Sequence, residues 1–283
     1  MKKIAVTITT LCTLAVLMLG CASNPAENDL NDFRDYFAER FPNTPMNDFN
    51  NGVYSVDKGS RDQWESLEEF PPYEIIVDKG EKLFKKPFKN GKTYAGCFST
   101  PVDGIKGSYP YFDKKRKEVV TLEMAINECR KANGEKPLKW KKGAITHIGA
   151  YLAYQARGKI VNVKIDSSEE SMKWYNRGKQ HFYAKRGQLN MSCADCHYYN
   201  SGNRIRADVL SPALGHTTHF PVYRNKWSGS GDGMGTLHRR YGGCNKQVRA
   251  KPFKAQSEEY RALEYFHTYM SNGLEMNGPG IRK

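Results

Sequence analysis

The stretch Ser192-Cys193-Ala194-Asp195-Cys196-His197 contains a Cys-x-x-Cys-His motif, and this motif decides the fold. Two thiols at this spacing reach the two vinyl groups of one haem, and the adjacent histidine places a ring nitrogen on the iron. A zinc site would need a second ligand pair of similar spacing, which the sequence lacks, and a redox dithiol would not need the histidine. The motif therefore predicts one covalent haem c, attached through Cys193 and Cys196, with His197 as an axial iron ligand.

The N-terminus predicts export. Two lysines precede an apolar, uncharged stretch (residues 4–19) that is short for a membrane span. Residues 1–21 are therefore interpreted as a signal peptide. Its end, Leu19-Gly20-Cys21, resembles a lipobox in which Cys21 carries a lipid, and ordinary cleavage nearby is the alternative. We expect a periplasmic protein that touches a membrane only through such a lipid.

The charge balance points to anionic partners. The chain carries a formal net charge of +14, which becomes +12 without the two signal-peptide lysines. A strongly basic exported protein favours anionic substrates or acidic protein surfaces. Nucleic acid is a poor candidate, because export removes the opportunity and no basic-aromatic recognition motif is present.

The rest of the chain contains a spaced repeat. Measured from Cys129 and from Cys244, a Thr lies at −8, a Pro at +8, a Tyr at +25 and a Gly at +29 in both halves. The segment that precedes the haem motif, Gly178–Phe182, also resembles Gly80–Phe84. Coincidence in a compositionally biased chain is the alternative. The repeat predicts two related domains of one fold.

In this alignment Cys97 matches the first haem-binding cysteine. Thr100 replaces the second cysteine and Pro101 replaces the histidine, so the upstream domain is predicted to hold no haem. Cys97 and Cys129 then face one vacated site, and a disulfide between them would contribute roughly 3 kcal/mol. Two free thiols are the alternative. Cys244 is left without a cysteine partner.

The predicted fold is mainly α, with two tandem class I cytochrome c-like domains of which the first lacks haem. The boundaries are 1–21 for the signal peptide, 22–75 for an N-terminal extension, 76–168 for the upstream domain and 169–283 for the haem domain. Helices are expected over Ala144–Ala156, Ser171–Arg186 and Gln256–Asn272, with loops around the haem between residues 196 and 236. The polar extension is expected to have a frayed start and to pack on the upstream domain.

The second axial ligand is not fixed by composition. Met and His are the commoner ligands in cytochromes, whereas the repeat favours the lone thiol because Cys129 and Cys244 occupy matching places. The downstream candidates are His216, His219, Met234, His238, Cys244, Met270 and Met276.

Three segments resemble the SoxA family, the cytochrome subunits of periplasmic thiosulfate-oxidising Sox systems. They are Leu189–His197 (LNMSCADCH), Thr236–Tyr241 (TLHRRY) and Cys244–Ala250 (CNKQVRA), and the resemblance covers roughly residues 75–283. It implies that Cys244 is an axial ligand able to carry a persulfide and that Arg240 faces the substrate. From the residues alone, Arg240 could equally be a haem-propionate partner or a surface charge. The family has two-haem and one-haem forms, and the lost motif at Cys97 matches the one-haem form.

The resemblance also implies an activity, that of an L-cysteine S-thiosulfotransferase. Such an enzyme joins thiosulfate oxidatively to a cysteine of a SoxYZ carrier protein and passes the electrons through haem c to a small cytochrome, SoxX, in a heterodimer. A thiolate on iron lowers the reduction potential, and a guanidinium matches the oxygens of a sulfur oxyanion. The alternatives are an electron-transfer cytochrome without catalysis and a thiosulfate dehydrogenase that forms tetrathionate.

Overall fold

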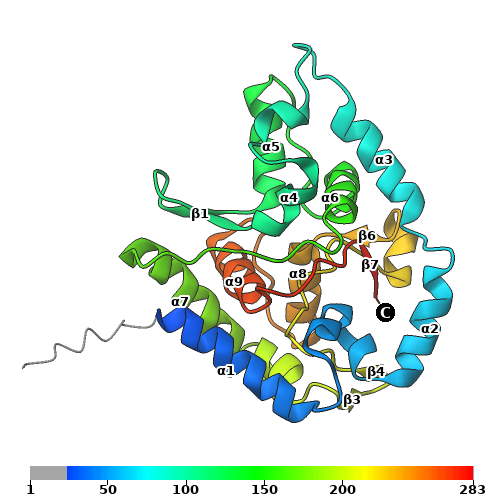
Figure 1. Cartoon of the computed structure of the whole chain (residues 1–283), viewed down its shortest axis with the longest axis vertical. Helices are drawn as coiled ribbons and strands as arrows, with labels where there is room; N and C mark the ends of the chain where they lie inside the picture. The colour runs from blue at the N-terminus through cyan, green and yellow to red at the C-terminus, as the bar shows by residue number, and fades with distance from the viewer. Residues whose placement is uncertain (1–23, 283) are drawn as a thin grey trace, which may run out of the picture.

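The computed structural model describes residues 24–282, which form a mainly helical molecule (Figure 1). The predicted signal peptide and Cys21 lie outside these residues. Among residues 24–282, no helix is both long and apolar enough to cross a bilayer. The prediction of a mainly α fold is confirmed.

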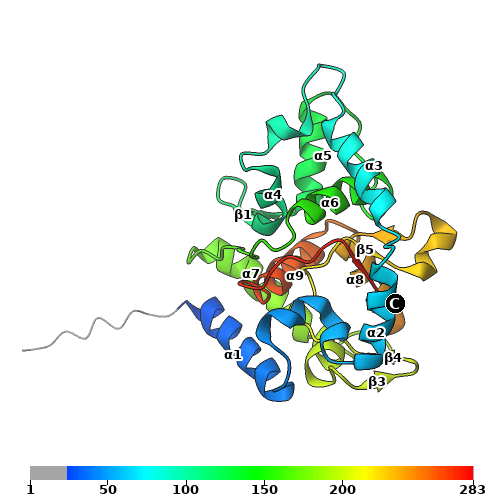
Figure 2. The same ribbon diagram turned by 45° about the vertical axis from the view of Figure 1, so that its right-hand side comes forward.

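The elements fall into an N-terminal segment, an upstream set and a downstream set (Figure 2). The N-terminal segment contains α1 (Pro25–Arg40), the 3₁₀ stretch η1 (Met46–Ser55) and α2 (Lys58–Glu68). The upstream set contains α3 (Glu74–Lys85), η2 (Tyr94–Cys97), α4 (Val102–Ile105), η3 (Lys106–Ser108), β1 (Tyr111–Asp113), β2 (Glu118–Val120), α5 (Leu122–Ala132) and α6 (Ala144–Gln155). The downstream set contains α7 (Glu169–Tyr183), the π-helical turn η4 (Asp195–Tyr199), β3 (Arg204–Ile205), β4 (Asp208–Val209), β5 (Val222–Tyr223), η5 (Asn225–Ser230), β6 (Met234–Gly235), α8 (Leu237–Gln247), α9 (Glu258–Tyr269) and β7 (Gly280–Ile281).

The expected helices form close to their predicted bounds, as α6, α7 and α9. Residues 200–233, between the haem motif and α8, are mostly loops, as expected, and contain two short strand pairings. Strand β5 lies at the centre of a small sheet, antiparallel to β6 and parallel to β7. This sheet brings the C-terminal residues beside the loops that follow the haem motif.

The upstream and downstream sets share several features of their helices. Helices α5 and α8 are each 11 residues long. Each is N-capped by a threonine: Thr121 Oγ1 accepts from Met124 N at 3.2 Å, and Thr236 Oγ1 accepts from Arg239 N at 3.4 Å. The two most extensive helix pairings are also matched, α3 with α6 upstream and α7 with α9 downstream.

Both helix pairings cross at a glycine. A Cβ on Gly80 would lie 1.9 Å from the carbonyl oxygen of His147, and a Cβ on Gly178 would lie 2.0 Å from that of Ala262. Only glycine allows such an approach of two helix backbones. This close packing explains why the sequence repeats a glycine at the start of both matching segments.

The predicted disulfide is present in the upstream set. Cys97 and Cys129 are bonded with their Cα atoms 5.7 Å apart. Aromatic side chains crowd this region, with the Phe84 ring 5.7 Å from the Tyr94 ring and 6.3 Å from the Phe98 ring. The corresponding downstream cysteine, Cys244, is a free thiol.

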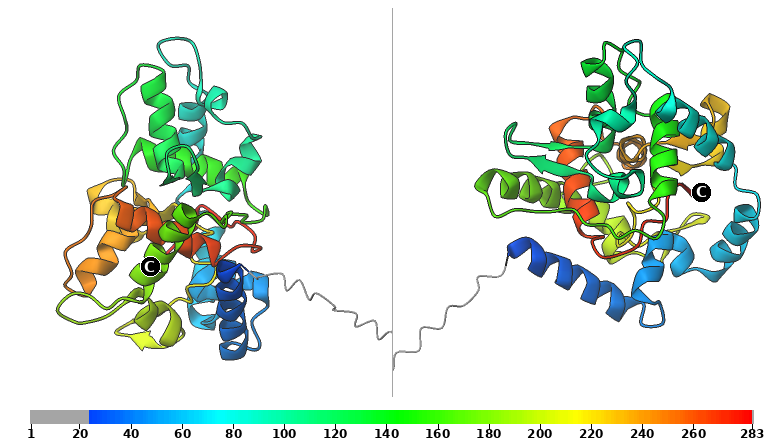
Figure 3. Two further views of the ribbon diagram at one scale, coloured as in Figure 1. Left: turned by 90° about the vertical axis from the view of Figure 1, so that its left-hand side faces the viewer. Right: turned by 45° about the horizontal axis from the view of Figure 1, so that its top comes forward.

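The prediction that the N-terminal extension packs on the upstream domain with a frayed start is wrong for α1. Asn24 caps the helix, accepting from Ala26 N at 3.1 Å, so its start is ordered. Phe33, Tyr36 and Phe37 form an aromatic stripe at helical spacing, and Tyr36 stacks at 3.8 Å on Tyr198, next to the haem motif. The downstream set offers the matching aromatic face, which is why α1 docks there (Figure 3).

Helix α2 and its neighbours connect the two sets. Tyr54 of η1 stacks on Trp64 of α2 at 4.8 Å, and Trp64 packs against the upstream core. The hydroxyl of Tyr54 donates to the Ile281 carbonyl at 3.1 Å, in the downstream sheet. The extension therefore spans both sets rather than covering the upstream one alone.

Candidate functional site

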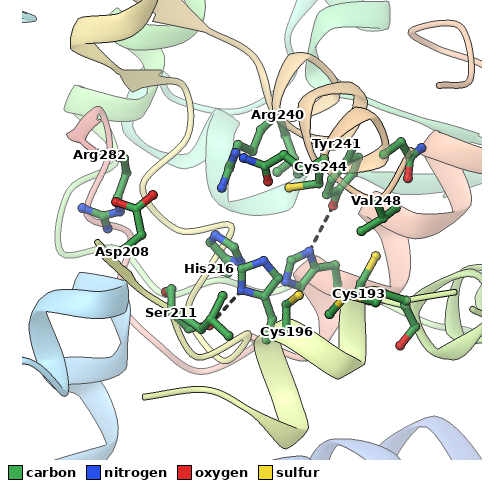
Figure 4. A pocket seen from close by; sticks show the side chains of 18 of the residues that line it. Cys193, Cys196, Asp208, Ser211, His216, Arg240, Tyr241, Cys244, Val248 and Arg282 are labelled. Carbon is green, nitrogen blue, oxygen red and sulfur yellow. Dashed lines mark hydrogen bonds between the residues drawn. The ribbon is translucent and has the colours of Figure 1, made fainter. Parts of the chain in front are cut away.

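A cavity of about 340 Å³ lies in the downstream set, between the haem motif and α8. Figure 4 shows Arg240, Tyr241 and Cys244 projecting from one helix toward Cys193 and Cys196 on the opposite wall. The five site residues predicted downstream all line this cavity: Cys193, Cys196, His197, Arg240 and Cys244. The fold therefore brings together residues that lie up to 51 positions apart in the chain.

The haem motif is held by a reciprocal cap. Ser192 N donates to Asp195 Oδ2 at 2.8 Å, and Asp195 N donates to Ser192 Oγ at 2.9 Å. These two bonds fix the first turn of the motif in the manner of a capping box. Cys193 and Cys196 are consequently presented from one turn toward the same cavity, as two thioether bonds to one haem require.

His197 is oriented as an iron ligand should be. Its Nδ1 lies 2.9 Å from the Ser211 carbonyl oxygen, which can only accept, so Nδ1 carries the proton. Nε2 then keeps its lone pair for a metal. Two free thiols and an imidazole with a fixed tautomer, all at one cavity, fit a haem c.

Several buried polar atoms around the cavity have no hydrogen-bond partner among residues 24–282. They are His216 Nδ1, His219 Nδ1, Arg224 Nε, His267 Nε2 and Arg282 Nη2. Unpaired buried polar atoms are costly, and their clustering at one cavity indicates that a polar group belongs there. The carboxylates of a bound haem, or another anion in the same cavity, would supply such a group.

Cys244 faces this site from α8. Burial would raise the pKa of its thiol, but the Arg240 guanidinium, a hydrogen bond to His197 and the charge of Arg224 outweigh burial and lower that pKa to about 6. In contrast, burial raises the pKa of Cys193 to about 12. Because Arg240 precedes Cys244 by four residues in a helix, the two side chains share a face.

Most of the other candidate axial ligands point elsewhere. Met234 packs in the upstream core, and Met270 and Met276 pack in the downstream core. His238 Nδ1 accepts from Gln256 N at 3.0 Å, and its Nε2 lies 2.9 Å from a Glu264 oxygen. None of these four residues lines the cavity.

His216 and His219 do line the cavity. The His216 ring is 4.7 Å from that of His197, and His219 Nε2 accepts from Arg282 Nε at 2.9 Å. His219 is thereby engaged with a cation, and His216 neighbours the first ligand rather than α8. Cys244 is the candidate that reaches the cavity from the α8 side.

The cavity residues that the sequence reasoning missed include Arg224, His267 and Arg282. The Tyr241 hydroxyl lies 3.1 Å from His267 Nδ1, and burial lowers the pKa of His267 to about 3. Arg282 arrives through the pairing of β7 with β5. No local spacing marks these residues, because only the tertiary fold brings them to the haem motif.

The other basic residues near α8 are not part of the cavity. Arg239 lies over the Trp227 ring at 4.2 Å and donates to the Met234 carbonyl at 2.7 Å. Arg249 follows the end of α8. Neither residue lines the cavity, so Arg240 is the cation that α8 itself contributes.

Comparisons with known proteins agree with this geometry. A family model described as "SoxA/TsdA, cytochrome c domain" matches residues 79–161, within the range predicted for the upstream domain. The chain is 54% identical to L-cysteine S-thiosulfotransferase subunit SoxA of Chlorobaculum thiosulfatiphilum, over 95% of each chain. It is 50% identical to the SoxA subunit of Allochromatium vinosum, over 95% of this chain and 98% of that one.

A solved structure is also similar. The crystal structure of SoxXA from P. pantotrophus superposes with a TM-score of 0.70 at 32% identity, covering 81% of this chain and 86% of that chain. The chain is 54% and 50% identical to two SoxA subunits over 95% of its length, and its haem motif shares a cavity with a cysteine of α8. These findings together support one assignment. The chain belongs to the SoxA family of cytochrome c proteins.

Proposed function

We propose that this protein is the thiosulfate-binding subunit of an L-cysteine S-thiosulfotransferase. The observation that carries the proposal is the position of Cys244, a free thiol that lines the same cavity as His197 and has Arg240 on the same helical face. The relatives that match over 95% of this chain are named for this activity. In the reaction, the outer sulfur of thiosulfate bonds to the sulfur of a carrier cysteine. The products are the carrier S-thiosulfonate, one proton and two electrons.

We assign one haem c to each chain, held by Cys193, Cys196 and His197, with Cys244 as the second axial ligand. When bound, the haem supplies a one-electron acceptor beside the thiolate. Arg282 and His219 would be available to the carboxylates of a bound haem. Thr100 and Pro101 stand where a second motif would need a cysteine and a histidine, which supports a count of one.

Cys244 and Arg240 have separate roles in this proposal. Cys244 is the residue that we assign as able to carry a persulfide, and the surrounding cations favour its thiolate over its thiol. Arg240 holds the sulfonate oxygens, since a guanidinium presents paired N–H donors to an oxyanion. Binding and redox chemistry are thus adjacent on one turn of α8.

The electron count and the charge indicate partners. Two electrons leave and one haem holds one at a time, so we propose a SoxX-like small cytochrome as the second redox partner; the similar P. pantotrophus structure is titled SoxXA. We propose a SoxYZ-like carrier as acceptor and the periplasm as location, with any membrane contact made through a lipid at Cys21. The domain division is proposed as 22–75, 76–168 and 169–283 after a signal peptide at 1–21.

The test uses the purified complex with its small cytochrome, a carrier protein, thiosulfate and an oxidised electron acceptor. The expected product is a carrier whose intact mass has gained one S-thiosulfonate, with two electrons delivered per carrier modified. Tetrathionate without carrier modification would make the protein a thiosulfate dehydrogenase. Haem reduction by an external donor, with neither product, would make it an electron-transfer cytochrome.

A further inference from the structure

Arg224 is a buried cation that the assignment above does not use. Its side chain is 4% exposed and lines the same cavity as Cys244 and Arg240. Its Nε has no hydrogen-bond partner in the part of the chain that the structure describes. A buried guanidinium nitrogen without a partner is costly, and a bound anion would offset that cost.

The backbone fixes where this guanidinium points. Arg224 directly follows β5, the central strand of the sheet, and its N–H donates to the Gly233 carbonyl at 2.9 Å. Its guanidinium lies over the Trp227 ring at 5.3 Å. Because the strand anchors the backbone and the indole holds the plane of the side chain, Arg224 is preorganised toward the cavity.

No carboxylate neutralises Arg224 directly. Among residues 24–282, no ion pair within 4.0 Å involves it, and Asp208 acts on it only through a longer-range charge interaction. Burial and the nearby Arg240 lower the pKa of Arg224 to about 10. Two guanidiniums therefore stand close enough to repel each other, beside one thiolate, which leaves excess positive charge.

A haem carboxylate is the other anion that such a cation could meet, and Arg282 is better placed for it. Arg282 contacts His219, lies over the Tyr54 ring at 4.8 Å and approaches the Gly52–Ser211 region, on the His197 side of the cavity. The charges of Arg240 and Arg224, in contrast, both act on Cys244. Of Arg224 and Arg282, it is Arg224 whose charge lowers the pKa of Cys244, together with that of Arg240.

We propose that Arg224 is a second substrate-binding residue, which together with Arg240 holds the sulfonate group of a dianion against Cys244. The proposal rests on the function proposed above and deepens it. One guanidinium comes from α8 and the other from the loop after β5, so the oxygens are gripped from two directions. Two cations opposite two negative charges select thiosulfate over a monoanionic thiosulfonate of similar shape.

The experiment compares Arg224→Gln with the wild-type holo-complex. We expect KM for thiosulfate to rise about tenfold or more, while kcat changes by less than about threefold. Competitive inhibition by sulfate should weaken by a similar factor, and inhibition by methanesulfonate should change much less. Haem content, visible spectrum and reduction potential should match the wild type. Arg224→Lys should recover part of the affinity, because it restores the charge without the fork.

Arg239→Gln is the matched control, since Arg239 also lies over Trp227 but outside the cavity. Arg239→Gln should leave KM for thiosulfate unchanged. If KM rose equally in both variants, the proposal would be overturned, and the effect would be due to altered packing of the loop around Trp227. An altered potential or haem content in Arg224→Gln with unchanged KM would make Arg224 a haem-carboxylate partner. If the wild type yields no carrier conjugate, the proposed function fails, and thiosulfate affinity measured from the haem spectrum still tests Arg224.

Discussion

Helices α5 and α8 carry a cysteine at the same position, and the two cysteines have different roles. Cys129 of α5 is bonded to Cys97 in a region filled by aromatic rings, whereas Cys244 of α8 remains a free thiol beside a cavity. The two sets are otherwise alike in their threonine-capped helices and glycine crossings. The role of this cysteine therefore depends on the residue that lies opposite it. Opposite a second thiol it becomes a cross-link, and opposite an oriented histidine it becomes available to a metal.

Removal of Cys244 should have the largest effect. Cys244→Ala should abolish carrier conjugation, to less than about one-hundredth of the wild-type rate, and change the haem spectrum, because the iron loses a thiolate. Visible spectroscopy and carrier mass spectrometry on the same sample measure both effects. Retention of the wild-type spectrum would refute the ligand assignment, with His216 the next candidate in the cavity.

The matching upstream change should act on stability alone. In Cys97→Ser/Cys129→Ser, the loss of the cross-link should lower the free energy of unfolding of the upstream set by roughly 3 kcal/mol, since the bridge closes a separation of 32 residues. The haem spectrum and KM for thiosulfate should stay at wild-type values. Denaturant-dependent hydrogen exchange of the helices, read beside the haem signal, resolves the two sets. A changed haem potential would show that the disulfide also supports the downstream site.

Substitution of Gly80 or Gly178 should disturb helix packing equally but should affect the haem only at Gly178. Gly80→Ala and Gly178→Ala each force a methyl group into a carbonyl of the crossing helix, and each should destabilise the protein by about 1–3 kcal/mol. Only Gly178→Ala, on α7, should also broaden or shift the haem spectrum. Thermal unfolding and spectroscopy on the two variants check this. Equal disturbance of the haem by Gly80→Ala would mean that the sets are tightly coupled.

The free energy of unfolding of the downstream set should also fall at acid pH because of one buried histidine, an effect smaller than those above. His181 occupies the place that Leu83 has upstream, and burial, followed by the charge of Arg186, lowers its pKa to about 3. A histidine kept neutral in the folded state costs stability once pH falls below its unfolded pKa of about 6.5, because the unfolded chain then binds the proton more readily. His181→Leu should therefore become more stable relative to wild type between pH 6.5 and 4, by about 1–2 kcal/mol at pH 5. A pH-independent difference in unfolding free energy would contradict this.

The features that could be predicted from the sequence are those that depend on residue spacing within a short segment or on a recognisable motif. The haem motif, the Cys97–Cys129 pairing and the shared face of Arg240 and Cys244 follow from fixed spacings, and the main helices follow from periodicity and caps. The docking of α1 was predicted wrongly, because an aromatic stripe indicates that a helix is buried but not which surface buries it. Arg224 and Arg282 could not be found, since only the pairing of β5 with β6 and β7 brings them to the site.

The docking of α1 has a consequence for how the chain assembles. Its aromatic stripe finds its partners, such as Tyr198, more than 150 positions later in the chain. At ordinary rates of synthesis, on the order of ten seconds pass between the appearance of the stripe and that of its docking face. During that interval three large rings are exposed to any protein that binds apolar segments, and contacts of such long sequence separation form slowly. Because the docking face of α1 includes Tyr198, α1 can dock only where the region that follows the haem motif is in place.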